Sequence, residues 1–290
     1  MTEPTAHTME APGALLTYDV RRNDSSRQPT LFLIGSPMGA SGFVTLASHF
    51  ADRTVVTYDP RGAERSPRTD DATRNTPEEH ADDLYRIIAA LGTGPVDLFA
   101  SSGGAVNALA LVERHPEQIR TLVAHEPPTA MVLPDRDAAL AACVAIHETY
   151  ERAGFGPAMA KFIALVSHEG PVPAGFGDQP GPDPAMFGLP TEDDGSRRDP
   201  LLGLNMPAIN EYEPDFEALR AASTRIVIGV GAQSGRMMAG RGGIGVAEGL
   251  GAPPVIFPGG HDGFLGGEYG QTGEPDAFAA KLREVLSADA

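Results

Sequence analysis

A predicted strand turns directly into a predicted helix in residues 96–109, which read VDLFASSGGAVNAL. The apolar first half is typical of a buried strand, and a helical pattern follows at once and lasts until His115-Pro116. Small residues flank Ser102, so the backbone can turn sharply and push the Ser102 hydroxyl out above the sheet. The helix start just behind it presents free backbone N–H groups and the positive end of a dipole. This arrangement suits a nucleophile whose reaction develops an oxyanion, and Ser102 is the candidate.

The turn departs from the usual nucleophile pattern at one position. That pattern reads Gly-x-Ser-x-Gly, and here Ala100 replaces the first glycine. Alanine is small enough to pack there, so the turn is interpreted as a tolerated variant. The alternative is a Ser/Gly-rich loop between strand and helix that binds a phosphate or nothing.

Strands and helices alternate on both sides of this turn. Apolar runs predict further strands, and periodic runs predict further helices; the strands are expected at 13–22, 29–35, 54–58, 121–126, 224–230 and 254–257, and the helices at 42–50, 77–91, 236–250 and 275–286. Such alternation predicts an α/β fold with a doubly wound, mostly parallel sheet.

The alternation lapses between residues 127 and 218. Helical periodicity is present at 135–153 and 157–167, and proline and glycine dominate residues 170–190. This segment cannot easily supply sheet strands, so we expect a core of residues 1–133 and 216–290, with an inserted helical cap at 134–215 that carries a flexible arm.

Composition limits the classes of partner. The chain has 290 residues and a formal net charge of −17, which argues against nucleic acid or an anionic membrane surface. Its one cysteine, Cys143, excludes an intramolecular disulfide and fits a reducing compartment. The N-terminal residues do not resemble a signal peptide, and no apolar run reaches membrane-spanning length. We therefore expect a cytoplasmic protein that acts on a small molecule and can form a homo-oligomer.

The candidate base is His261, in the loop after the last predicted strand. In this architecture that loop can curl back towards Ser102, and a serine nucleophile needs a base there. Two N–H groups are needed for the oxyanion. Gly103 follows the nucleophile, and Ser36 is the best donor in the turn after the strand ending at Gly35, with Met38 second.

These features, together with the Asp59-Pro60-Arg61-Gly62 turn, resemble the α/β-hydrolase superfamily, in the same chain order and everywhere except the cap. The resemblance implies that Ser102 attacks a carbonyl, that His261 is the base and that the Asp59–Gly62 turn is structural. Members cleave esters, lactones, amides, epoxides and carbon–carbon bonds, so the fold alone identifies neither reaction nor substrate.

The acid of the triad is the point where this chain departs from the family pattern. Relatives commonly carry Asp or Glu just after the strand that ends here near Val230, where this sequence has no carboxylate. Three explanations stay open: Glu126 at the end of the preceding strand is the acid, Gln233 or Ser234 holds the histidine as a neutral partner, or the chemistry is degraded or altered. The first is preferred, and Asp262 and Glu248 are poorer candidates.

The expected function is a serine hydrolase of a small to medium apolar ester or lactone, without cofactor or metal. Met38, Met131 and Phe187 are the expected substrate contacts, in a cleft with other apolar cap residues such as Phe162. Serine at position 102 counts against an aspartate nucleophile, and the glycine-rich segments lack the spacing or context of a dinucleotide site. The alternatives are a non-hydrolytic serine enzyme, such as one that cyclises or perhydrolyses, and a ligand-binding protein that has lost turnover.

Overall fold

The computed structural model describes residues 3–288, and within them eight strands form one sheet. In chain order the strands are β1 (Thr5–Ala11), β2 (Ala14–Arg21), β3 (Leu31–Ile34), β4 (Val55–Asp59), β5 (Val96–Ser101), β6 (Ile119–His125), β7 (Arg225–Gly231) and β8 (Val255–Phe257). Their order across the sheet is β1-β2-β4-β3-β5-β6-β7-β8. Pairing is antiparallel for β1 with β2 and for β2 with β4, and parallel from β4 onwards. This confirms the predicted α/β fold with a mostly parallel sheet.

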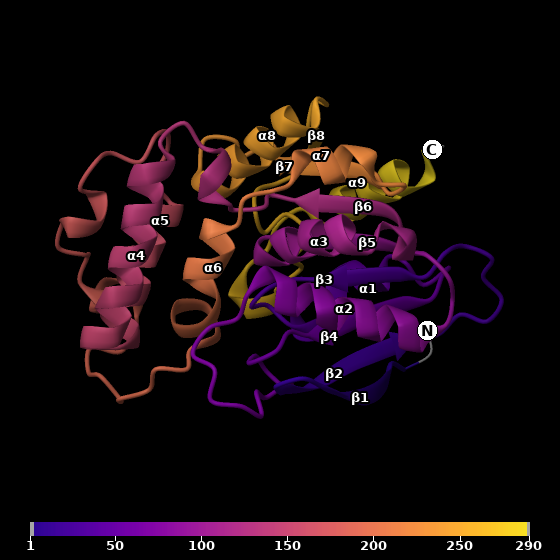
Figure 1. The fold of residues 1–290 in the computed structure, drawn as a ribbon, viewed down its shortest axis with the longest axis horizontal. Helices are drawn as coiled ribbons and strands as arrows, with labels where there is room; N and C mark the ends of the chain where they lie inside the picture. Colours follow the sequence, from indigo (N-terminus) through magenta and orange to yellow (C-terminus); the bar gives the residue numbers. More distant parts are fainter. Residues whose placement is uncertain (1–2, 289–290) are drawn as a thin grey trace.

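Helices cover both faces of the sheet (Figure 1). The longer helices of the described chain are α1 (Val44–Ser48), α2 (Pro77–Leu91), α3 (Gly103–Arg114), α4 (Arg136–Ala153), α5 (Phe155–Val166), α6 (Met206–Glu211), α7 (Phe216–Ala221), α8 (Met238–Leu250) and α9 (Pro275–Ser287). Side chains from α2, α3, α7 and α8 share one buried cluster with one face of the sheet, and α1 and α9 share another with the opposite face. Because successive strand residues point to opposite faces, Phe32 lies in the first cluster and Leu33 in the second.

Three helices, α4, α5 and α6, lie beyond one end of the sheet (Figure 1). They share a third cluster with one another, which includes Cys143, Tyr150, Leu165, Leu202 and Met206. The predicted helical periodicity of residues 135–153 and 157–167 corresponds to α4 and α5. We keep the division into a core and a cap at residues 134–215 as a proposal.

Several elements differ from the sequence-based expectation. Strand β1 was not predicted because its side chains are exposed or half-buried along an edge, so it lacks an apolar run. Helices α6 and α7 were missed because each is six residues long, too short for periodicity to identify. A π-helical turn at Pro200–Asn205 leads directly into α6. Among residues 3–288, no helix is long and apolar enough to span a bilayer.

Candidate active site

The turn at Ser102 connects β5 to α3 with a strained backbone. Ser102 has φ +59° and ψ −132°, and its N–H donates to the carbonyl of His125 at 3.0 Å. The two glycines after it are needed for close approach. A Cβ on Gly103 would lie 2.6 Å from the carbonyl oxygen of Ser36, and one on Gly104 would lie 2.8 Å from the backbone of Gly35. The loop after β3 therefore packs directly against the first turn of α3.

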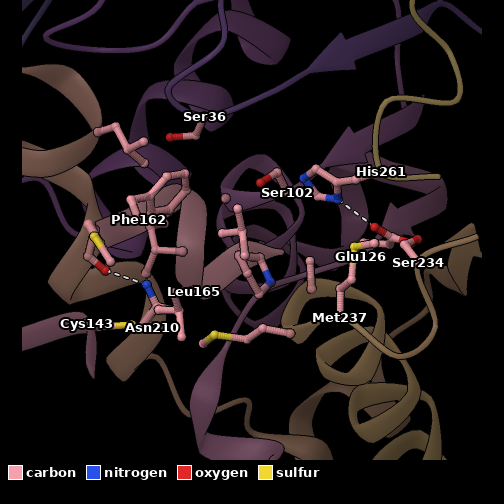
Figure 2. A pocket seen from close by; sticks show the side chains of 18 of the residues that line it. Ser36, Ser102, Glu126, Cys143, Phe162, Leu165, Asn210, Ser234, Met237 and His261 are labelled. Carbon is pink, nitrogen blue, oxygen red and sulfur yellow. Dashed lines mark hydrogen bonds and ion pairs between the residues drawn. The ribbon is translucent and has the colours of Figure 1, made fainter. Parts of the chain in front are cut away.

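His261 lies between Ser102 and Glu126 (Figure 2). Its Nδ1 is 2.5 Å from Glu126 Oε2, and the second ring nitrogen is turned towards Ser102 (Figure 2). The Glu126 side chain is fully buried, whereas that of His261 is 42% exposed. Since Glu126 is ionised, Nδ1 must carry the proton in this bond, and the other nitrogen is left with a lone pair.

Glu126 is held by a second set of donors. Its Oε1 accepts a hydrogen bond from Gly231 N–H at 2.7 Å and another from the Ser234 hydroxyl. Burial alone would raise the pKa of Glu126. The hydrogen bond from His261, the nearby His125 and the Ser234 hydroxyl outweigh burial and lower this pKa to about 2. The carboxylate is therefore charged throughout the neutral pH range.

The three explanations for the absent acid can now be compared with the geometry. Glu126 contacts His261, and Ser234 contacts Glu126 rather than the histidine. Gln233 turns away, its Nε2 lying 3.3 Å from a carboxylate oxygen of Glu274. Asp262 and Glu248 make no hydrogen bond to His261 within residues 3–288. The sequence identified Ser234 as a candidate partner of His261, but not as a hydrogen-bond partner of Glu126.

His125 is a buried neighbour that the sequence did not single out. Its Nδ1 lies 3.2 Å from the Ser101 hydroxyl, and its ring stacks on that of His261 with centroids 6.1 Å apart. Burial lowers the pKa of His125 to about 4, so its ring is neutral at pH 7. Ligand atoms of His125, Glu126 and His261 lie within 4.8 Å of one another. A metal ion there would have to replace the bond between Glu126 and His261.

A cavity of about 520 Å³ opens in front of Ser102. Most of its wall is apolar and comes from α4, the end of α5, α6 and the start of α8. The lining residues are Ser36, Ser102, Gly103, Glu126, Pro128, Cys143, Phe162, Leu165, Val166, Ser167, Leu201, Asn205, Met206, Ile209, Asn210, Ser234, Met237, Met238, Ala239, His261, Asp262 and Gln271. Glu126 and Asp262 are the only carboxylates in this lining, and it contains no lysine or arginine.

The three substrate contacts that the sequence predicts do not line this cavity. Met38, Met131 and Phe187 are absent from the described cavity lining. Met38 folds back over Gly35 and Gly42 and packs against the buried cluster below the loop. Phe187 is 41% exposed in a short turn of the arm, and Met131 lies in the turn before α4. Hydrophobic character alone does not say which face of a loop a side chain occupies. Phe162 does line the cavity, as expected.

Comparison with known proteins agrees with this architecture. The family described as the alpha/beta hydrolase fold matches residues 29–165. An uncharacterized hydrolase of Bacillus subtilis, YraK, is 39% identical over 122 residues, which are 41% of this chain and 44% of that protein. A proline iminopeptidase of Xylella fastidiosa is 34% identical over 97 residues, which are 33% of this chain and 31% of the relative. The matches thus span less than half the length of these curated relatives.

Similarity to solved structures extends over nearly the whole chain. The structure of a thermophilic esterase from Thermogutta terrifontis superposes with a TM-score of 0.65, covering 98% of both chains at 19% identity. At that identity the likeness concerns the fold. The sheet order, the turn between β5 and α3 and the family match lead to one conclusion: this chain has the α/β-hydrolase fold.

Proposed function

We propose that the protein is a serine hydrolase that cleaves an ester or lactone of a small to medium apolar substrate through an acyl-enzyme. The observation that carries the proposal is the hydrogen bond between Glu126 and His261, with Ser102 on the other side of the imidazole (Figure 2). A nucleophile, a base and an ionised group that orients the base are the parts that acyl transfer requires.

In the first half of the reaction, Ser102 Oγ attacks the carbonyl carbon and His261 Nε2 takes the hydroxyl proton. Glu126 holds Nδ1–H and stabilises the imidazolium that forms, while Gly231 and Ser234 keep the carboxylate in place. The N–H groups of Gly103 and Ser36 are the proposed oxyanion donors. Gly103 opens α3, so its N–H has no partner inside the helix.

In the second half, the tetrahedral intermediate collapses and the leaving oxygen takes the proton from His261. A water molecule then attacks the acyl carbon, giving a proton to His261, and the acid leaves as Ser102 recovers its proton. No residue outside the described site is needed for this cycle.

The cavity supports the substrate class. At about 520 Å³ it falls within the range of small-molecule sites, roughly 300–1,000 Å³. Phe162, Leu165 and Met206 make much of its wall apolar, so an aliphatic acyl or alkyl group would be taken out of water there.

The test is hydrolysis of p-nitrophenyl esters from acetate to octanoate by the wild type and by Ser102→Ala. We expect turnover by the wild type, its loss in the variant, and an optimum chain length that reflects the cavity. Circular dichroism confirms that the variant is folded. Turnover that survives in Ser102→Ala would refute the acyl-enzyme. Slow acylation without release would favour the ligand-binding alternative instead.

A further inference from the structure

One polar side chain in the apolar wall of the cavity has an unused hydrogen-bonding atom. Asn210, on α6, is 8% exposed and lines the cavity. Its Nδ2 donates to the carbonyl oxygen of Met206 at 2.8 Å. That bond sets the orientation of the amide, because only the NH₂ group can face a carbonyl. Within residues 3–288, Asn210 Oδ1 has no hydrogen-bond partner.

The other asparagine of the wall behaves differently. Asn205 Oδ1 accepts from His80 at 2.7 Å and from Asn75 at 3.3 Å, while its Nδ2 donates to the Pro200 carbonyl. Its Oδ1 is thus fully used, and the amide holds the π-helical turn to the core. The contrast identifies Asn210 Oδ1 as the free acceptor of the two.

The surroundings of Asn210 offer it no donor of equal strength. Cys143 and Leu165 lie beside it, on the far side of the cavity from Ser102 and His261 (Figure 2). The Cys143 thiol is a weak donor, and burial raises its pKa to about 12, so it stays protonated. Asn210 Oδ1 is not among the fully buried polar atoms that lack a partner, so solvent can reach it through the cavity. A substrate chain that covers this atom removes it from water and has to supply a donor in its place.

We propose that Asn210 is a specificity-determining residue that selects substrates with an uncharged acyl chain bearing an O–H or N–H donor. The inference deepens the proposed function and rests on it. The chain must be uncharged near Asn210. No lysine or arginine lines the described cavity to pair with an anion, and its two carboxylates, Glu126 and Asp262, belong to the His261 side of the cavity, so a cation beside Asn210 would also be unpaired. A donor is the group that matches Asn210 Oδ1, which can only accept. The second N–H of Asn210 Nδ2 could bind a ligand acceptor instead, and a methoxy-to-alkyl ratio that falls as far as the hydroxyl-to-alkyl ratio in Asn210→Leu would overturn the preference for a donor.

The experiment uses trios of p-nitrophenyl esters whose acyl chains match in length and differ only at the end. One trio is heptanoate, 6-hydroxyhexanoate and 5-methoxypentanoate, and further trios are one and two methylenes shorter and longer. The hydroxyl end donates, the methoxy end only accepts, and the alkyl end does neither. The quantity measured is the ratio of kcat/KM for the hydroxyl and alkyl members, compared between the wild type and Asn210→Leu.

We expect this ratio to fall about tenfold or more in Asn210→Leu at the chain length that reaches α6, with the methoxy-to-alkyl ratio unchanged. Asn107→Leu is the matched control, since Asn107 is a buried asparagine of α3 outside the described cavity lining; it should keep the wild-type ratio. If leucine does not fit at position 210, Asn210→Ala tests the same atom. A hydroxyl-to-alkyl ratio that stays within twofold of wild type at every length would overturn the inference.

Failure of the proposed function has a different signature. In that case the wild type hydrolyses no ester, or Ser102→Ala is as active as the wild type. Calorimetric binding of methyl 6-hydroxyhexanoate and methyl heptanoate then replaces turnover. A preference for the hydroxyl ester that Asn210→Leu removes would support the role of Asn210 as a binding residue. Equal preference in both proteins would refute it.

Discussion

Replacing Glu126 by glutamine tests the proposed site, because the substitution changes which nitrogen of the His261 ring carries the proton. Two donors, Gly231 N–H and the Ser234 hydroxyl, point at Glu126 Oε1. A glutamine in the same place must present its carbonyl oxygen to these two donors, so its NH₂ group faces His261. Nδ1 then has to accept a hydrogen bond, which moves the imidazole proton to Nε2. A base protonated on the nitrogen that faces Ser102 cannot take the serine proton.

The size of the effect follows from this reversal. The same carboxylate-to-amide change in the triad of a serine protease lowers kcat by about 10⁴-fold because it stabilises the wrong tautomer. We expect a loss of about 10³- to 10⁴-fold in kcat here, equivalent to about 4–5 kcal/mol of transition-state stabilisation. KM should change little, because the proposed role of Glu126 is to orient the His261 imidazole and not to bind the substrate.

The assay is steady-state hydrolysis of the best p-nitrophenyl ester, with circular dichroism and thermal melting to show that Glu126→Gln is folded. Ser234→Ala is the matched control, since it removes one donor to the carboxylate but leaves the charge and the tautomer. It should lose far less activity than Glu126→Gln. A folded Glu126→Gln protein within tenfold of wild-type kcat would refute the reasoning and remove Glu126 from the mechanism.

Two further predictions concern the turn and the buried histidines. In Gly103→Ala the new Cβ would meet the Ser36 carbonyl oxygen at 2.6 Å and displace the turn that carries the proposed oxyanion donors, so kcat should fall roughly a hundredfold, as loss of one donor does. Gly235→Ala is the control, since its Cβ meets nothing within 4 Å, and it should have wild-type kinetics. Equal activity of both variants would contradict the prediction. Burial lowers the pKa of His80 and of His125 from 6.5 to about 4 in the folded state, so between pH 6.5 and 4 the unfolded chain binds more protons than the folded one. The free energy of unfolding should therefore fall by up to about 3 kcal/mol per pH unit as the pH drops through that window, and urea titrations followed by circular dichroism measure this dependence. His80→Gln should halve the contribution of the two histidines to the slope of the unfolding free energy against pH. A slope that this substitution leaves unchanged would count against a buried neutral His80.

Local chemistry explains why much of the architecture could be predicted. The apolar run of β5 and the glycines after Ser102 predict a strand, a sharp turn and a helix within a few residues. Thr76 and Pro77 similarly mark the start of α2, where the structure shows a capping box with Glu79. Such signals depend on neighbours in the chain, so the sequence contains them directly.

The contacts among distant residues were harder to predict. Glu126 was preferred as the acid, but its hydrogen bond to His261 joins residues 135 positions apart, and its bond from Ser234 joins residues 108 positions apart. Of the predicted substrate contacts, Met38 is partly buried and packs against the cluster below its loop rather than lining the cavity. Helix α6, which supplies Asn210, was not predicted. Which loop residues face a cavity depends on how the loop packs, which hydrophobicity does not reveal.

The sequence by itself determined the alternation of strands and helices, the position of the sharp turn at Ser102 and a short set of candidate residues, because each rests on periodicity, turn chemistry or topological order. The tertiary structure alone decided which carboxylate meets His261 and which polar atom is left free in the cavity. Both depend on packing between segments far apart in the chain: Gly231 lets the His261 loop approach β7 closely, since a Cβ there would lie 2.8 Å from Gly260, and so brings His261 to Glu126.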